Sequence, residues 1–192
     1  DSIMAYKQHF IEWFSGKQIP SYWTQVGGGT FAMSDEVDGG MKLLTTASTS
    51  NKTQLTFGNK RQYSPTASEI IVNFRRLTGS GGMAQSGLFG LGGDATEHAF
   101  WRDLESTTYK TLKTGDASTN SGTASDVAVD LVLTNYKINY NTTDIKAYIN
   151  GVLKVTKTTN RPTVRLQPIV WAQNSSAVAR GGEFTYLECY NT

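Results

Sequence analysis

The chain has 192 residues, of which 18% are charged, and its 18 basic and 16 acidic side chains give a net charge of +2. No basic run exceeds two residues and no apolar run approaches a membrane span, so we expect neither a nucleic-acid partner nor membrane insertion. The single cysteine, Cys189, excludes an intramolecular disulfide and a zinc site built from cysteines. We expect Cys189 to be a small buried residue of the last strand.

Residues 1–16, DSIMAYKQHFIEWFSG, form the one segment with the features of a helix, because Ser2 is a suitable cap and Gly16 a suitable end. Two interpretations stay open for this N-terminal helix or arm. We favour a helix or strand folded onto the rest of the chain, and the alternative is an arm that docks on another subunit. Residues 17–192 are predicted to form one β domain.

From Tyr22 onward the sequence alternates apolar and polar residues in short runs separated by turn residues, which is typical of antiparallel strands. A polar loop is predicted over residues 116–126. The predicted strands cover residues 22–35 (two strands around a Gly turn), 39–48, 51–59, 68–79, 86–93, 98–105, 108–115, 127–140, 145–149, 152–155, 163–173 and 182–191.

Residues 138–155, INYNTTDIKAYINGVLKV, carry two tight reversals. Asn150-Gly151 is a strong signal for a two-residue hairpin, because such turns need positive φ at both central positions. The earlier interruption, Asn141 to Asp144, has turn residues as well. The pattern predicts a β-meander, and the whole chain reads as an all-β, two-sheet antiparallel jelly-roll sandwich.

Two stretches resemble concanavalin A-like lectin/glucanase sandwiches. The first is FSGKQIPSYWTQVGGGTFAMSDEVDGGMKLLTT, residues 14–46, and the second is YKINYNTTDIKAYINGVLKVTKTTNRP, residues 136–162, which is similar to a laminin-G-like hairpin. The resemblance implies a convex and a concave sheet, with any sugar site on the concave face or the rim loops. This fold hosts lectins, adhesion modules, viral coat and spike domains, and glycosidases, so it does not choose among these functions.

Glucanases of this fold carry Glu-x-Asp-x-Glu on one strand, since glycoside hydrolysis needs two facing carboxyl groups. Glu36 and Asp38 match this spacing, but Gly40 stands at the third position, and we interpret both acids as turn residues. Asp103 and Glu105 are the alternative catalytic pair, roughly 6.5–7 Å apart along a strand. Residues 109–115, YKTLKTG, are similar to one strand of the polysaccharide lyases that share the fold.

The run EHAFWRDLE, residues 97–105, carries the most suggestive face. We expect His98, with Phe100, Arg102 and Leu104, to point to the core, and Trp101, Asp103 and Glu105 to point outward. Sugar sites combine aromatic faces with planar polar groups. The candidate ligand-binding residues are therefore Trp101, Asp103, Tyr109, Trp171, Gln173 and Asn174, although Trp171 shares its face with Ile169 and a core role is equally consistent.

No cofactor is expected. Calcium is an open alternative, because DEVDGG (residues 35–40), Gly92–Asp94 and Asn141–Asp144 offer oxygen ligands without a specific spacing. The leading hypothesis is a non-catalytic lectin-like module that is structural or binds a glycan or protein receptor, on a virion, phage appendage or cell surface. A homo-oligomer or a larger surface assembly would fit this role. The alternative is a polysaccharide-active glycosidase or lyase.

Overall fold

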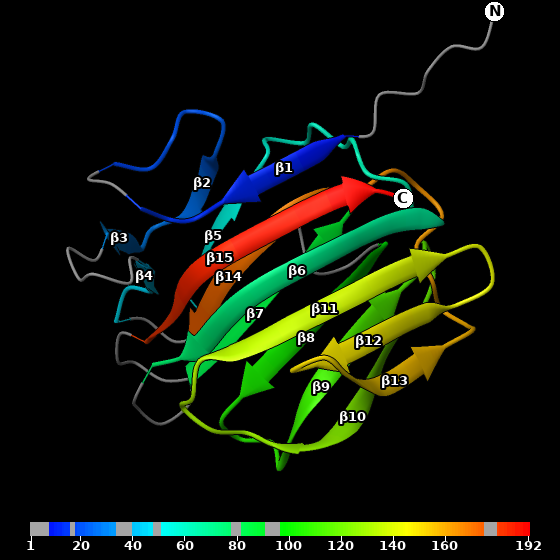
Figure 1. Ribbon diagram of the computed structural model, residues 1–192. Coiled ribbons are helices and arrows are strands. Elements are labelled where there is room, and N and C mark those ends of the chain that lie inside the picture. The colour runs from blue at the N-terminus through cyan, green and yellow to red at the C-terminus, as the bar shows by residue number, and fades with distance from the viewer. Residues whose placement is uncertain are drawn as a thin grey trace, which may run out of the picture.

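The computed structural model describes residues 8–15, 18–33, 40–47, 51–77, 82–90, 97–174 and 180–192. These residues form two antiparallel sheets packed face to face, and none of them is helical (Figure 1). Accordingly, no helix long and apolar enough to cross a membrane occurs in this part of the chain. The predicted all-β jelly-roll sandwich is confirmed.

The larger sheet has eight strands in the order β13-β12-β11-β6-β15-β4-β3, with β1 pairing on β15. It lies in front in Figure 1. Its strands are β1 (His9–Glu12), β3 (Thr30–Met33), β4 (Met41–Leu44), β6 (Ala67–Arg76), β11 (Thr134–Asn141), β12 (Ile145–Ile149), β13 (Val152–Lys157) and β15 (Gly181–Asn191).

The second sheet has seven strands in the order β10-β9-β8-β7-β14-β5-β2. Its inner face packs on the larger sheet, and its outer face carries the site described below. Its strands are β2 (Thr24–Gly27), β5 (Lys52–Thr56), β7 (Gly82–Phe89), β8 (His98–Leu104), β9 (Tyr109–Gly115), β10 (Asn120–Ala128) and β14 (Gln167–Asn174).

The N-terminal segment is a strand where the structure describes it. β1 pairs with β15 through His9↔Tyr190 and Glu12↔Leu187, so the segment folds onto the sandwich as favoured, but by sheet addition and not as a helix. Residues 1–7 and 16 lie outside the described ranges. Phe10 packs edge-on against Phe57 with ring centroids 4.8 Å apart, which ties the strand to the core side.

The predicted meander of residues 138–155 is confirmed as β11, β12 and β13. Asn150 and Gly151 have φ of 49° and 78°, the left-handed conformation that a two-residue hairpin turn requires. At the other turn, the N–H of Asn141 donates to the carbonyl oxygen of Asp144 at 2.9 Å, and this hydrogen bond closes the reversal. Both reversals therefore follow from the turn residues read in the sequence.

The polar loop predicted over residues 116–126 is confirmed for residues 116–119 and wrong from Asn120 onward. Asn120–Ala128 is strand β10, paired with β9 from Asn120↔Gly115 to Ala128↔Tyr109. β10 is an edge strand whose side chains are mostly exposed, so neither of its faces needed apolar residues. The sequence signal of burial was therefore missing although the backbone pairing was present.

The main core lies between the two sheets. Ile70, Val72 and Phe74 alternate into it along β6, as predicted, and Cys189 is fully buried beside them. Phe74 stacks on Tyr136 with ring centroids 4.2 Å apart. Each such side chain contributes about 1.5–3 kcal/mol by leaving water, so this core is sufficient to hold the two sheets together.

Candidate functional site

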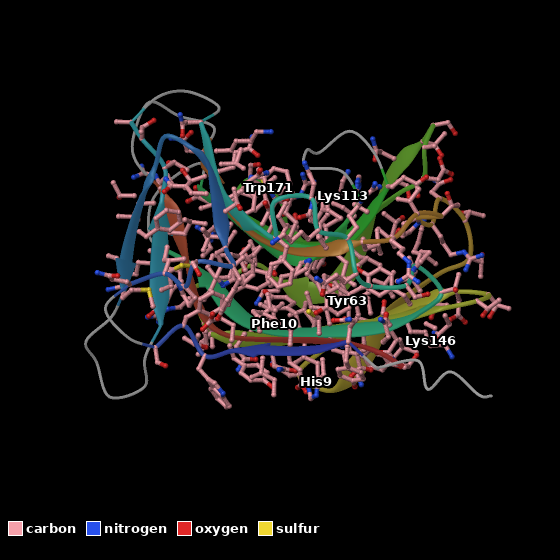
Figure 2. All side chains as sticks on the ribbon, turned by 90° about the horizontal axis from the view of Figure 1, so that it is seen from above. His9, Phe10, Tyr63, Lys113, Lys146 and Trp171 are labelled. Atoms are coloured by element: carbon pink, nitrogen blue, oxygen red, sulfur yellow. The ribbon has the colours of Figure 1, made fainter. Side chains whose placement is uncertain are left out.

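The outer face of the seven-stranded sheet is hollowed. One cavity of about 240 Å³ lies over strands β7, β8, β9, β10 and β14. Figure 2 shows Trp171 and Lys113 on this side of the molecule, with His9 and Lys146 away from it. The lining residues are Met83, Gln85, His98, Phe100, Arg102, Lys113, Asn120, Trp171 and Gln173.

The register of the sheet brings these residues into rows. Gln85 on β7 pairs with Arg102 on β8 and with Trp171 on β14, so the three side chains stand next to each other across three strands. In the neighbouring row, Phe100 stands opposite Lys113 of β9. Because side chains alternate between faces, both rows point to the outer side.

Aromatic rings form the floor of the cavity. Phe89, Phe100, Ile169 and Trp171 make a small apolar cluster that is separate from the main core. Phe100 stacks on Phe89 with ring centroids 4.8 Å apart and lies 5.8 Å from Trp171. A rigid aromatic surface of this kind suits the apolar face of a sugar ring.

Two glycines leave room for this floor. A Cβ on Gly87 would lie 2.3 Å from the carbonyl oxygen of Ala99 and 2.5 Å from Cα of Phe100, so only glycine allows β7 and β8 to approach here. A Cβ on Gly122 would lie 3.1 Å from Cδ of Lys113. The stem of Lys113 therefore rests on Gly122 of the neighbouring edge strand.

Several hydrogen-bond donors in the cavity have no acceptor within the described ranges. These are Nε2 of Gln85, Nε of Arg102 and Nε1 of Trp171, all buried from water. Buried polar groups are normally hydrogen-bonded, and an unpaired donor costs about 1–3 kcal/mol. The cavity is therefore rich in donors that a ligand can satisfy.

The surroundings of Arg102 and Lys113 lower the pKa values of both side chains. Burial lowers the pKa of the Arg102 guanidinium. Burial also lowers the pKa of Lys113, and the positive charge of Arg102 lowers it further. The two side chains are thus close enough to repel each other, and no carboxylate lines the cavity among the described residues.

A second hollow of about 260 Å³ continues the outer face toward β5 and β2, lined by Thr24, Val26, Lys52, Gln54, Thr56, Gly58 and Asn59. Gln54 is the register partner of Trp171, and Nζ of Lys52 lies 5.8 Å from the Trp171 ring. Trp171 therefore stands between the two hollows, which lie on the same face of the sheet.

The predicted outward face of residues 97–105 is wrong. Trp101 is fully buried between the sheets, where its Nε1 donates to the carbonyl of Lys137 at 3.3 Å. His98, Phe100 and Arg102, which we expected in the core, line the outer cavity instead. The alternation was recognised, but the assignment of its two faces was inverted because both are apolar and both are buried.

Asp103 also lies between the sheets and not on a ligand-accessible surface. It is fully buried, with Oδ1 3.3 Å from Nε of Arg76 and Oδ2 3.8 Å from Nζ of Lys110. Burial raises the pKa of this carboxyl, and the charges of Lys110 and Arg76 oppose the rise. Glu105 lies in the turn after β8. The alternative catalytic pair Asp103 and Glu105 therefore does not form on one open face.

The remaining predicted site residues are divided. Trp171 and Gln173 line the cavity, so their role in binding stays a prediction that the geometry permits. Tyr109 is 43% exposed at the start of β9 and does not line it. Asn174 is buried at the end of β14, where its Nδ2 donates to the carbonyl of Thr46 at 2.9 Å and its Oδ1 accepts from the N–H of Asn51 at 2.9 Å. Asn174 therefore holds the end of β14 to the backbone at Thr46 and Asn51.

The acidic alternatives give no site in the described ranges. Glu36, Asp38 and Asp94 lie outside them. Glu97, directly before β8, accepts a hydrogen bond at Oε1 from the hydroxyl of Thr163 at 2.9 Å, so it is engaged within the protein. Asn141 donates to Asp144 at 2.8 Å within their turn. Across the part of the chain that the structure describes, no three His, Cys, Asp or Glu side chains gather as metal ligands.

No protein-family model and no curated protein sequence matches the chain. Solved structures match along nearly its whole length. The β-glucanase of Bacillus licheniformis is 16% identical, covers 96% of this chain and 98% of its own, and superposes with a TM-score of 0.66. The Crh5 transglycosylase is 12% identical over 96% of this chain and 84% of its own, with a TM-score of 0.69.

The carbohydrate recognition domain of Emp47p is 13% identical over 95% of this chain and 94% of its own, with a TM-score of 0.66. Enzymes and a recognition domain thus share one architecture with this chain. The protein has the concanavalin A-like jelly-roll fold of lectins and glucanases, as the two sequence stretches indicated. The fold alone does not decide between catalysis and binding.

Proposed function

We propose that the protein is a non-catalytic carbohydrate-binding module whose ligand lies on the outer face of the seven-stranded sheet. The observation that carries the proposal is the cavity around Trp171, which combines an aromatic floor with amide and cationic donors. Small-molecule sites in proteins have this composition. Neighbours of the same fold include a carbohydrate recognition domain, which adds support.

The composition of the cavity favours binding over hydrolysis. A glycosidase needs two carboxyl groups about 5–9.5 Å apart across the scissile bond. The described lining of both hollows contains no Asp or Glu side chain. Two acids near the sheet have other roles, because Asp103 is held inside by Arg76 and Glu97 by Thr163.

The test is calorimetric titration of the protein with a panel of soluble polysaccharides. Trp171→Ala and Gln173→Ala should each weaken binding roughly tenfold, because each removes a contact worth about 1.4 kcal/mol. Trp13→Ala is the matched control, since Trp13 is 62% exposed and packs on Tyr186 of the other sheet. Thermal unfolding of each variant verifies that it is folded.

Three outcomes contradict the proposal. The protein binds no polysaccharide, or Trp171→Ala and Gln173→Ala both bind with the affinity of the unchanged protein, or a bound polysaccharide is cleaved. Cleavage would establish the glycosidase or lyase alternative. The receptor role, the oligomeric assembly and the extracellular or virion-surface location stay predictions from the sequence.

A further inference from the structure

The outer face carries positive charge without compensating acids. Arg102 and Lys113 line the first hollow and Lys52 the second, and neither described lining includes a carboxylate. Arg102 and Lys113 form no ion pair with any residue of the described ranges. Lys110, three residues earlier on the same strand, points inward and lies 2.9 Å from Asp130. Arg102 and Lys113 therefore differ from the inward-pointing Lys110, which has an acidic partner.

Arg102 and Lys113 are held near each other by the sheet. They stand on adjacent strands, Arg102 opposite Thr111 and Lys113 opposite Phe100, so their side chains leave the same face two positions apart, as diagonal neighbours. Lys113 lies along Gly122, where a Cβ would stand only 3.1 Å from its Cδ. Two like charges in a partly desolvated hollow repel each other, and an anion between them removes this repulsion.

The neighbouring donors add a second, independent indication. Gln85 is 1% exposed and Trp171 is 2% exposed, and Nε2 of the first and Nε1 of the second have no partner in the described structure. Nε of Arg102 is in the same situation. Neutral sugar hydroxyls donate as well as accept, whereas carboxylate and sulfate oxygens only accept. A surplus of donors therefore matches an anionic ligand.

We propose that the cavity binds an acidic polysaccharide, with a carboxylate or sulfate group of one sugar unit between Arg102 and Lys113 and an adjoining ring on Trp171. This inference rests on the proposed carbohydrate-binding function and adds the chemical class of its ligand. The carboxylate of a uronate and a sulfate ester share the chemistry that these donors recognise, and the test separates them.

The experiment measures binding to polymers that differ in charge on one backbone. Hydroxyethylcellulose and carboxymethylcellulose form the first pair, and dextran and dextran sulfate form the second. An oligogalacturonate and a heparin oligosaccharide represent carboxylated and sulfated natural glycans. We expect the protein to bind at least one acidic member of the panel and to bind its neutral counterpart roughly tenfold more weakly, the loss of one charge-assisted hydrogen bond.

Lys113→Gln and Arg102→Gln should each weaken acidic binding roughly tenfold and reduce its salt dependence. Lys146→Gln is the matched control, because Lys146 belongs to β12 of the other sheet and lies away from Lys113 in Figure 2. Lys113 is half-buried and forms no ion pair among the described residues, so its variant remains informative if Arg102→Gln fails to fold. Preference for carboxylated or for sulfated members identifies the anionic group.

Equal weakening by Lys113→Gln and Lys146→Gln would mean adsorption of polyanions to net charge and would overturn the inference. Equal binding of neutral and acidic partners, unaffected by Lys113→Gln, would overturn it while the carbohydrate-binding function stands. If the protein binds none of these polymers, both the acidic-ligand inference and the proposed carbohydrate-binding function are wrong.

Discussion

Asp103 and Arg76 form a salt bridge inside the sandwich, with Oδ1 of the first 3.3 Å from Nε of the second and both side chains at most 7% exposed. The pair joins β8 of one sheet to β6 of the other. Because a buried charge without a partner is costly, the two residues depend on each other.

We therefore expect Asp103→Asn to lower the free energy of unfolding by about 3–5 kcal/mol, because it leaves Arg76 and Lys110 short of an anion. The double variant Asp103→Leu with Arg76→Met should recover part of this loss. Urea denaturation of Asp103→Leu, of Arg76→Met and of the double variant gives the coupling energy. Additive effects would show that the two residues are independent, and Asp126→Asn at the exposed pair with Lys154 is the control.

Alanine substitutions at Trp101 and at Trp171 should affect different properties of the protein, stability for Trp101 and glycan affinity for Trp171. Trp101→Ala empties part of the main core and should cost about 3–5 kcal/mol of stability, while the affinity of the folded fraction for a glycan is unchanged. Denaturation curves measure the first effect and titration below the unfolding temperature measures the second. Loss of affinity in a folded Trp101→Ala protein would contradict the placement of this ring between the sheets.

Asp116 at the β9–β10 turn should titrate far below the usual range. Its carboxylate accepts from the backbone N–H groups of Ser118 and Thr119 at 2.9 and 2.8 Å, which lowers its pKa to about 2. The folded pKa is below the unfolded one, so this contribution to stability is present above pH 4 and is lost as the pH falls toward 2.

The carboxyl carbon shift of Asp116, followed by NMR, measures this pKa directly. Asp116→Asn should remove the corresponding part of the acid dependence of stability. A titration midpoint at 3.8, the ordinary value for an aspartate side chain, would show that the turn does not bind the carboxylate.

Cys189 should be unreactive in the folded protein. Burial raises the pKa of its thiol to about 12, and only the thiolate attacks thiol reagents. We expect no labelling at neutral pH without denaturant and complete labelling after unfolding. Rapid modification of the native protein would mean that the β15 region opens locally, and an unchanged labelling rate across a denaturant series would confirm such opening.

The sequence predicted the fold where each signal had a single physical cause. Asn150-Gly151 tolerates positive φ, so the β12–β13 hairpin followed directly from it. Ile70, Val72 and Phe74 alternate with the less buried Ile71, Asn73 and Arg75, because one side of β6 faces the core. β10 was missed because an exposed edge strand needs backbone pairing alone.

The site was harder to predict, because β8 buries both of its faces. Trp101 packs into the main core and Phe100 into the outer cluster, so alternation separated the two sets without showing which was inside. The register that places Gln85 between Arg102 and Trp171 joins β7 and β8 to β14, which is distant in sequence, and has no local signal. Residue type singled out Trp171 and Gln173, which line the cavity, while the place of Phe100, Arg102 and Lys113 in its lining needed the assembled sheet.

The position of β15 has a consequence for how the protein forms. This last strand lies between β6 and β4 in the eight-stranded sheet, and its residue Cys189 pairs with Ile70 of β6 (Figure 1). A ribosome adding about 5–20 residues per second must finish β15 before that sheet can close. Until β15 has been synthesised, β6 exposes an unpaired edge, and the sheet, which is dominated by pairings between distant strands, then closes slowly.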